Sequence, residues 1–450
     1  MDSNAAQFSR EDDKERQLVS AEPAAEELGP ARGTSPQAAG EAGPGCQSTT
    51  QGSSSQPLRM EGYPDYLISG DIDWFEWCAL IDFSDSAIFQ NICEEFQRVK
   101  DKCQTDRRDF EEIILEGFGR VRVGRTGINR GGARGQHFEF QINVPGVTFG
   151  LSPRNVDDAI EGRGGHQVNF YSLQRGRDCL LVGAREGYRR AMEFIDFLCG
   201  EPADLKISRA DLALDICNLD TAELTKLVLA DHFVTLANNI RPEMNLVSKK
   251  QMGFSAGKSP MRLSVYDKYA ERLGKADDLY NQALIDRRWY GEMPRFATRV
   301  EYQMRRRWLL SQGIHSPMDF LGTCGSLCQK GTCEWFRITT DPVDRDNKHQ
   351  SRSEVHPIWH GIQRGFETVF GEPEVSLRPI SRQKISATKL LEQARGCLAS
   401  ALLQMDKKCE TYGQFAEASK RAIVAMASGK DAKEAFMTQL KKRKMEFETT

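Results

Sequence analysis

The chain has 450 residues, 39% of them hydrophobic and 28% charged, so it could form two or three domains and is too apolar to be disordered throughout. A formal net charge of −3 leaves only a local basic patch as a means of binding nucleic acid. No apolar run approaches the roughly 20 residues that span a bilayer, and the N-terminus has no apolar signal core. The sequence therefore predicts a cytoplasmic protein with no membrane partner, whose 12 cysteines are reduced.

Residues 1–64 are predicted to form a disordered acidic tail, since nine acidic residues stand against five basic ones up to Met60. Met60 is an alternative start. Residues 65–202 are predicted to form an N-terminal lobe with a strand at 71–82, helices at 89–103 and 184–199, and antiparallel hairpins over 118–150 and 167–182. Its glycine-rich hairpins carry Arg120, Arg122 and Arg125, which we expect to contact DNA.

Residues 203–345 predict a second lobe, and residues 346–450 a linker followed by C-terminal helices at 384–407 and 412–447. The predicted fold class is α+β, with antiparallel sheets and flanking helices in two lobes whose similar element order suggests duplication. The second lobe is predicted to hold strands at 205–216, 248–255, 262–266 and 295–304, and helices at 221–238 with Thr221 as N-cap, at 268–286, and at 308–321 with a break at Gly313.

Three strands of the second lobe each place polar side chains on one face. A solvated face with cross-strand ion pairs would explain any single strand. Three such strands together favour a site for metal and phosphate, because carboxylates bind Mg²⁺ or Mn²⁺, arginines neutralise phosphate, and a tyrosine hydroxyl can attack phosphorus. Alternation along each strand groups Arg209, Asp211 and Asp215; Arg262, Ser264 and Tyr266; and Arg299, Glu301, Gln303 and Arg305.

The candidate metal ligands are Asp211, Asp215 and Glu301. The two aspartates lie about 13 Å apart on an extended strand, so both cannot bind one ion directly. We expect one of them to bind Mg²⁺ or Mn²⁺ together with Glu301, and the other to hold an arginine or to support the ligands from behind.

Four motifs in this region resemble those of the replication initiation factor family. The family comprises rolling-circle initiators of plasmids and filamentous phages and related relaxases of integrative elements. The resemblance covers about residues 68–320, and the chain has no His-hydrophobic-His metal motif, which the family replaces with carboxylates. The motifs are Arg209-Ala-Asp-Leu-Ala-Leu-Asp215, Gly253-Phe-Ser-Ala-Gly-Lys-Ser259, Tyr266-Asp-Lys-Tyr-Ala-Glu271 and Arg299-Val-Glu-Tyr-Gln303.

The resemblance implies a metal-dependent endonuclease that nicks and rejoins origin DNA in rolling-circle replication or transfer of a mobile element. It implies Tyr266 as the nucleophile that forms a 5′-phosphotyrosine, Tyr269 as the alternative nucleophile, and Lys268 as a residue that lowers the nucleophile's pKa or contacts phosphate. A bacterial host, a helicase partner and a homodimer are also implied. Further DNA contacts are expected from Arg209, Lys258, Arg262, Arg299 and Arg305.

Two other functions stay open from the sequence. One is a DNA-binding regulator without catalysis on the same fold, and the other is a metal-dependent phosphodiesterase that uses water while Tyr266 only packs. A phosphate-binding loop at 253–259 is disfavoured because three residues, not four, separate its glycines. Substitution of Tyr266 would separate the leading function from the regulator, and the phosphodiesterase would give no covalent adduct.

Overall fold

The computed structural model describes residues 56–83, 87–130, 136–153, 168–244, 251–273, 275, 277–344, 350–374, 377, 395, 398–399, 401–402 and 411–427. Most of the predicted acidic tail and most of the two predicted C-terminal helices lie outside these residues, although α14 (Tyr412–Ala427) confirms part of the second helix. Within the part of the predicted tail that is described, β1 (Arg59–Met60) is formed and Met60 is buried in the main core. Among the described helices, none has the length and apolarity needed to cross a membrane.

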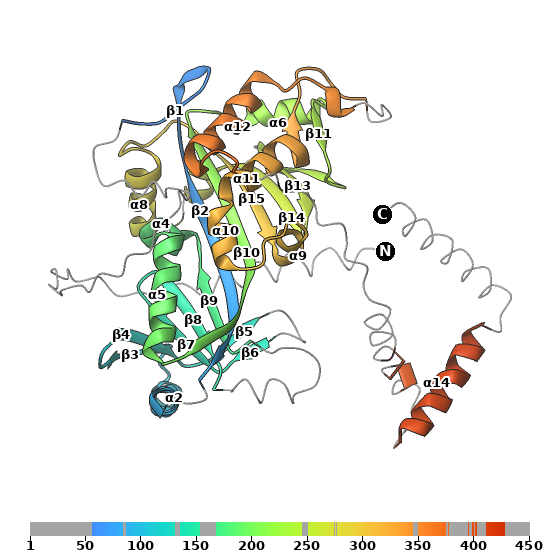
Figure 1. Cartoon of the computed structure of the whole chain (residues 1–450). Coiled ribbons are helices and arrows are strands. Elements are labelled where there is room, and N and C mark those ends of the chain that lie inside the picture. Colours follow the sequence, from blue (N-terminus) through green and yellow to red (C-terminus); the bar gives the residue numbers. More distant parts are fainter. Residues whose placement is uncertain are drawn as a thin grey trace. The chain divides into compact units, whose positions relative to one another are not determined.

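An antiparallel sheet of twelve strands dominates the described fold and confirms the predicted α+β class (Figure 1). Its strands lie in the order β12-β13-β14-β15-β10-β2-β9-β8-β7-β4-β3, with β1 paired to β2. Two smaller sheets pair β5 with β6 and β11 with β16. The remaining strands are β2 (Tyr63–Asp82), β3 (Phe110–Leu115), β4 (Gly119–Gly124), β5 (Ile128–Arg130), β6 (Gln136–Phe138), β7 (Phe140–Val144), β8 (Val147–Leu151), β9 (Phe170–Gln174), β10 (Glu201–Cys217), β11 (Phe233–Thr235), β12 (Ile240–Met244), β13 (Gln251–Lys258), β14 (Met261–Asp267), β15 (Ala297–Arg305) and β16 (Phe336–Ile338).

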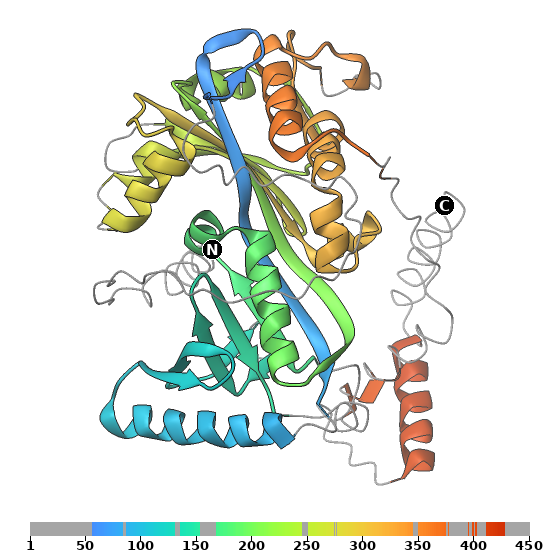
Figure 2. The same cartoon turned by 60° about the vertical axis from the view of Figure 1, so that its left-hand side comes forward.

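The two long strands β2 and β10 pair with each other along almost their whole length in the middle of the sheet (Figure 2). Helices pack against both faces of the sheet. The described helices that precede α14 are α2 (Ala87–Asp106), α4 (Gly176–Val182), α5 (Ala184–Phe197), α6 (Thr221–Leu229), α7 (Lys268–Arg272), α8 (Asp278–Arg288), α9 (Arg306–Ser311), α10 (Pro317–Gly322), α11 (Cys324–Gln329) and α12 (Pro357–Phe370), with the π-helix η2 (Lys330–Trp335) and the 3₁₀-helix η3 (Gln350–Arg352).

Local signals explain where the predicted helices differ from the observed ones. The helix predicted at 221–238 ends at Leu229, shortly before Asp231 takes a positive φ of 60°, and its N-cap is Asp220 rather than Thr221. The helix predicted at 268–286 is two helices, because Asp277 caps a new one by accepting from the backbone N–H of Tyr280. The hairpin predicted at 167–182 is a strand, β9, followed by α4.

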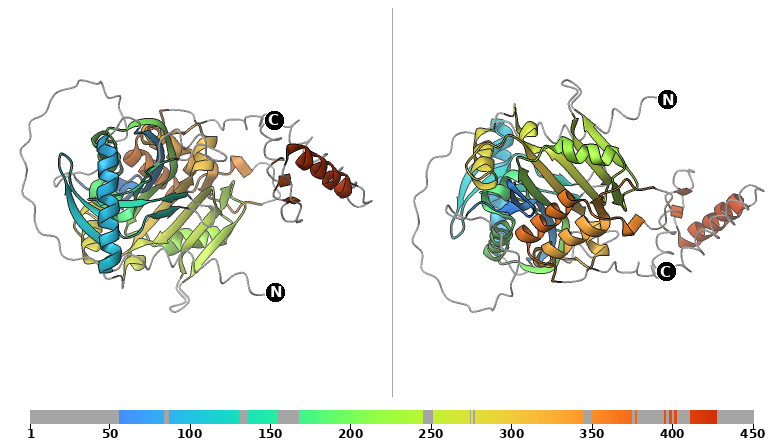
Figure 3. Two further views of the ribbon diagram at one scale, coloured as in Figure 1. Left: turned by 90° about the horizontal axis from the view of Figure 1, so that it is seen from below. Right: turned by 90° about the horizontal axis from the view of Figure 1, so that it is seen from above.

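The two faces of the β10–β15 region are covered differently. The apolar face, which includes Leu212 and Tyr302, packs into the main core under α12, whose Trp359 is fully buried. On the opposite face, a small apolar cluster that includes Leu284 and Trp289 joins α4 and α8 to the sheet. Figure 3 shows α12 (orange) and α8 (yellow) on different sides of the strands. This second cluster covers only one end of the polar face, so the polar side chains of that face range from fully buried to exposed.

Candidate functional site

Four neighbouring strands bring the predicted polar residues together. Asp215 of β10 lies opposite Arg299 of β15, which in turn lies opposite Tyr266 of β14. On the other side of β10, the register with β2 shifts between Asp211 and Leu212, which face Trp74 and Ile72. The shift leaves Asp73 as an extra residue, and its carboxylate reaches Arg299. Bulges of this kind re-aim side chains and occur often beside functional sites.

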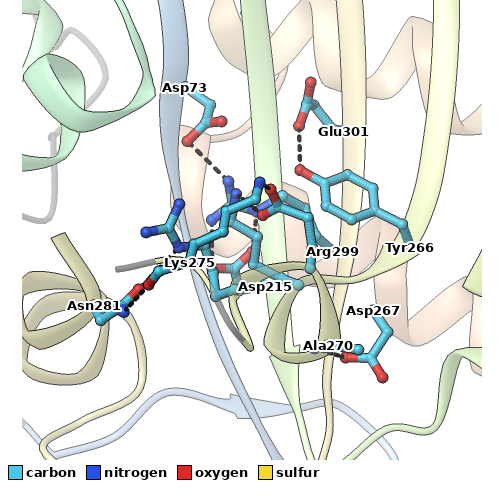
Figure 4. A network of polar contacts seen from close by, with 12 residues as sticks. Asp73, Asp215, Tyr266, Asp267, Ala270, Lys275, Asn281, Arg299 and Glu301 are labelled. Atoms are coloured by element: carbon cyan, nitrogen blue, oxygen red, sulfur yellow. Dashed lines mark hydrogen bonds and ion pairs between the residues drawn. The ribbon is translucent and has the colours of Figure 1, made fainter. Parts of the chain in front are cut away.

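Arg299 is a buried centre that holds two carboxylates (Figure 4). Its Nε lies 2.5 Å from Asp215 Oδ1, its Nη2 lies 2.8 Å from Asp215 Oδ2, and its Nη1 lies 2.9 Å from Asp73 Oδ1. Burial alone would raise the pKa of Asp73, but Arg299 and, more weakly, Lys268 lower it below its usual value. Asp73, Asp215 and Arg299 therefore form a fixed group of charges beside Tyr266.

The same pairing corrects two predictions. Arg299 has no exposed surface, so it cannot make the predicted contact with DNA phosphate. Asp215 is also fully buried, and both its oxygens are engaged by Arg299. It is therefore the aspartate that holds an arginine, which was the second of the two roles predicted for Asp211 and Asp215, and not a metal ligand.

Tyr266 donates its phenolic hydrogen to Glu301 Oε2 at 2.9 Å, and both side chains are only partly buried (Figure 4). Burial and the charge of Glu301 hold the pKa of Tyr266 well above its usual value, while Arg299 opposes this rise. Burial also raises the pKa of Glu301, and the negative charge of Asp73 adds to the effect. The pair therefore joins a hydroxyl that holds its proton more tightly than usual to a carboxylate that is a stronger base than usual.

Lys268 and Tyr269 lie on the short helix α7, which Asp267 caps by accepting from Ala270 N at 3.0 Å (Figure 4). Lys268 is buried: its Nζ lies 3.0 Å from Glu271 Oε2 and 5.7 Å from the centre of the Tyr266 ring. It contributes positive charge beside Glu301 and Asp73, whose pKa values it lowers, whereas Arg299 is the cation that lowers the pKa of Tyr266.

Tyr269, the predicted alternative nucleophile, is directed toward a different part of the molecule. Its ring meets that of Trp289 edge-on, with the ring centres 6.4 Å apart. Both belong to the small apolar cluster between α8 and the sheet. Tyr269 therefore packs against apolar groups, while Tyr266 contacts the carboxylate.

Asp211 is held by a second arginine, Arg209 of the same strand. Arg209 approaches its Oδ1 with Nε at 3.0 Å and its Oδ2 with Nη2 at 2.6 Å, and the guanidinium stacks 4.1 Å from the centre of the Trp74 ring. Gln303, with its amide oxygen turned toward Arg209, accepts from Nε at 2.9 Å. Burial raises the pKa of Asp211 to about 7 despite Arg209, and the negative charge of Glu301 adds to the rise.

The negative charges of Asp73 and Glu301 raise the pKa of Asp211, and that of Asp73 raises the pKa of Glu301. Carboxylates gathered in this way are typical ligands of a divalent cation. Across the described residues, however, no group of three or more His, Cys, Asp and Glu side chains is arranged to coordinate a metal ion. Mg²⁺ in phosphoryl-transfer sites often uses one or two carboxylates and completes its shell with water and phosphate oxygens. Glu301 fits that smaller set, whereas Asp211 could join it only after release from Arg209, which engages both its oxygens.

The other predicted DNA contacts fall into two groups. Lys258 and Arg305 are exposed on the open part of the polar face, and Arg262 is paired there with Glu243 at 3.0 Å. The second group lies on and just after β4, which is separated from β14 by six strands of the sheet, so it is not part of the tyrosine site. In this group Arg120 pairs with Glu112 at 3.4 Å, Arg122 lies over the ring of Phe110, and Arg125 pairs with Asp109 at 3.1 Å.

Sequence reasoning missed Asp73 and Trp74. Trp77 is fully buried, whereas Trp74 is half-buried under Arg209. The available signal was the pair Asp71 and Asp73, two acids spaced by one residue in a strand rich in apolar and aromatic residues.

No protein-family model and no curated protein matches this chain. Among solved structures, a rolling-circle replication initiator protein from Geobacillus stearothermophilus aligns with 69% of this chain and 100% of its own, at 13% sequence identity and a TM-score of 0.37. The geometry of this chain's own residues supports the chemistry proposed below, and the resemblance of its four motifs suggests the biological role.

Proposed function

We propose that the protein nicks and rejoins DNA to start rolling-circle replication or transfer of a mobile element. The observation that carries the proposal is the 2.9 Å hydrogen bond from Tyr266 to Glu301. A tyrosine attacks phosphorus only as its oxygen loses the proton, and Glu301 is positioned to accept it. The fixed charge of Arg299 stabilises the phenolate that forms.

In the proposed reaction, the Tyr266 oxygen attacks a DNA phosphodiester while Glu301 takes the phenolic proton. The new bond joins oxygen to phosphorus, the bond from phosphorus to O3′ breaks, and O3′ takes up a proton to leave as a 3′-hydroxyl. The strand then carries a 5′-phosphotyrosine. Attack by the 3′-hydroxyl on this phosphotyrosine reverses each step and rejoins the strand.

Arg299 is a positioning residue in this scheme, because it contacts neither solvent nor substrate. Its orientation is fixed by two bonds to Asp215 and by the ion pair with Asp73. A charge fixed before the reaction stabilises a developing anion without reorganisation. This explains why two carboxylates are committed to one arginine under the tyrosine.

Mg²⁺ or Mn²⁺ would be held by Glu301, and by Asp211 once Arg209 releases it, and would withdraw charge from the scissile phosphate. Origin DNA is the substrate that the proposal requires. A helicase and a second copy of the chain are partners that the family resemblance suggests, and they belong to the proposal only on that ground.

The test uses the full chain, Mn²⁺ and single-stranded fragments of the DNA that carries its gene, labelled at either end. The label should enter a denaturant-resistant adduct from the 3′ end only, because the 5′ fragment leaves with a free hydroxyl. Tyr266→Phe should abolish the adduct and retain binding, while the matched change Tyr269→Phe three residues away should retain both. An adduct that persists in Tyr266→Phe would refute the assignment of the nucleophile.

The same experiment separates the alternatives. Cleavage without an adduct would identify the phosphodiesterase that uses water. Binding without cleavage in either metal would identify the regulator without catalysis.

A further inference from the structure

A groove with a volume of about 370 Å³ opens on the polar face of β12–β15. Its floor is formed by small residues of β13, including Ser255 and Gly257. Gly257 has a φ of +75°, and a Cβ there would lie 2.7 Å from the carbonyl oxygen of Met261 and 2.8 Å from the ring of Trp335. Larger residues at position 257 are therefore disfavoured by both the backbone and its neighbours.

The walls of the groove are strongly basic. Arg241, Lys258, Arg262 and Arg305 line it, against Glu243 as the acidic residue of the lining. Arg241, Lys258 and Arg305 are exposed, and Arg262 is partly exposed in its 3.0 Å ion pair with Glu243. A carboxylate and a phosphate offer an arginine the same kind of charged oxygen acceptors. Glu243 thus occupies a position on Arg262 that a phosphate could take.

The groove is small enough to take a short segment of one strand: it lies on β12 to β15, which span about 14 Å at about 4.8 Å per strand spacing, and it has a volume of about 370 Å³. The groove also leads to the tyrosine: Arg262 and Tyr266 share a face of β14 four residues apart, about 13 Å on an extended strand.

We propose that this groove binds the backbone phosphates of a single-stranded segment next to the bond that Tyr266 attacks, and that Glu243 holds Arg262 until a phosphate displaces it. This inference rests on the proposed function and adds to it the path of the bound strand. It predicts that removing the charge of Arg262 and removing the charge of Glu243 change DNA affinity in opposite directions.

The experiment measures the anisotropy of a fluorescent oligothymidine bound to the full chain carrying Tyr266→Phe, over a range of NaCl concentrations. Arg262→Gln should weaken binding about tenfold, and the plot of log K against log salt should become shallower by about 0.7, as expected for one lost phosphate contact. Glu243→Gln should tighten binding by up to about fivefold, since an exposed ion pair worth up to about 1 kcal/mol no longer competes.

Matched controls come from Arg189 and Glu186, an Arg–Glu pair at the surface of α5 whose atoms lie 2.6 Å apart. Helix α5 packs against the apolar face of the sheet, away from the groove. Arg189→Gln and Glu186→Gln should leave affinity within about twofold of the parent. Thermal unfolding of each variant would show that the fold is retained.

The inference is overturned if Glu243→Gln and Arg262→Gln change affinity in the same direction, or if neither changes it more than the α5 controls. The assay involves no cleavage, so it is independent of the nicking chemistry. Opposite effects without any adduct in the nicking assay would keep the groove and refute the nicking function; an adduct with unchanged affinities would do the reverse.

Discussion

The buried pair of Asp215 and Arg299 should dominate the stability of the site. Asp215→Asn preserves the shape of the side chain and removes its charge, so it leaves Arg299 with Asp73, 2.9 Å away, as its carboxylate partner. Removing one member of a buried ion pair costs about 3–5 kcal/mol. Because Asp73 retains part of the neutralisation, we expect a loss of about 3 kcal/mol in the free energy of unfolding.

A second substitution tests the reason for that loss. If the cost comes from an uncompensated buried charge, adding Arg299→Met to Asp215→Leu should recover much of the loss caused by Asp215→Leu alone, since apolar groups can replace a buried pair at little cost and Lys268 still stabilises the charge of Asp73. The coupling energy of the double-mutant cycle should then exceed about 2 kcal/mol.

Urea denaturation, followed by both circular dichroism and tryptophan fluorescence, would measure these energies from shifts in the midpoint. Asp286→Asn, on the exposed side of α8, is the control and should change stability by less than about 0.5 kcal/mol. A loss below about 1 kcal/mol for Asp215→Asn, or additive losses in the cycle, would refute the view that charge compensation organises the site.

Two further substitutions probe the surroundings of the tyrosine. Gly253→Ala should destabilise the protein by more than about 2 kcal/mol and slow nicking, because Gly253 has a φ of +147° and its Cβ would lie 1.9 Å from the carbonyl oxygen of the residue before Tyr266. The control Gly291→Ala, at φ +81° in open space, should cost about 1 kcal/mol. Equal losses for the two variants would contradict the steric reason. The raised pKa of Asp211, about 7 against about 3.9 in the unfolded chain, means that the folded state binds more protons, so this group's contribution to stability falls as pH rises from about 4 to 7. Denaturation of Asp211→Asn at several pH values should show its stability rising relative to the parent across that interval and levelling off above it, and a difference that does not vary with pH would count against the raised pKa.

Alternation along the strands predicted which residues share a face, because the period of two follows from the pleat itself. It did not predict which acid meets which arginine, since that depends on the register between strands far apart in the sequence. One of Asp211 and Asp215 was expected to bind the metal with Glu301, and the other to hold an arginine or to support the ligands. The register places Asp215 opposite Arg299, and Arg209 of the same strand holds Asp211, so both aspartates hold an arginine.

Asp73 illustrates a second limit of the sequence. Its side chain reaches the site because β2 carries an extra residue where it pairs with β10, and an extra residue in one strand is defined only relative to its partner. The division of one predicted helix into α7 and α8 was more accessible, because Asp277 is a capping residue visible in the sequence.

The pairing of β2 with β10 determines how two fragments of the chain would behave. A cut between residues 200 and 201 would give one fragment ending after α5 and another beginning with β10, and each would expose the long unpaired edge that the other now covers (Figure 2). Such edges promote aggregation. Neither half should stay soluble when expressed alone, whereas the two halves produced together in one cell should reassemble, so the long ladder could serve as the joint of a split protein.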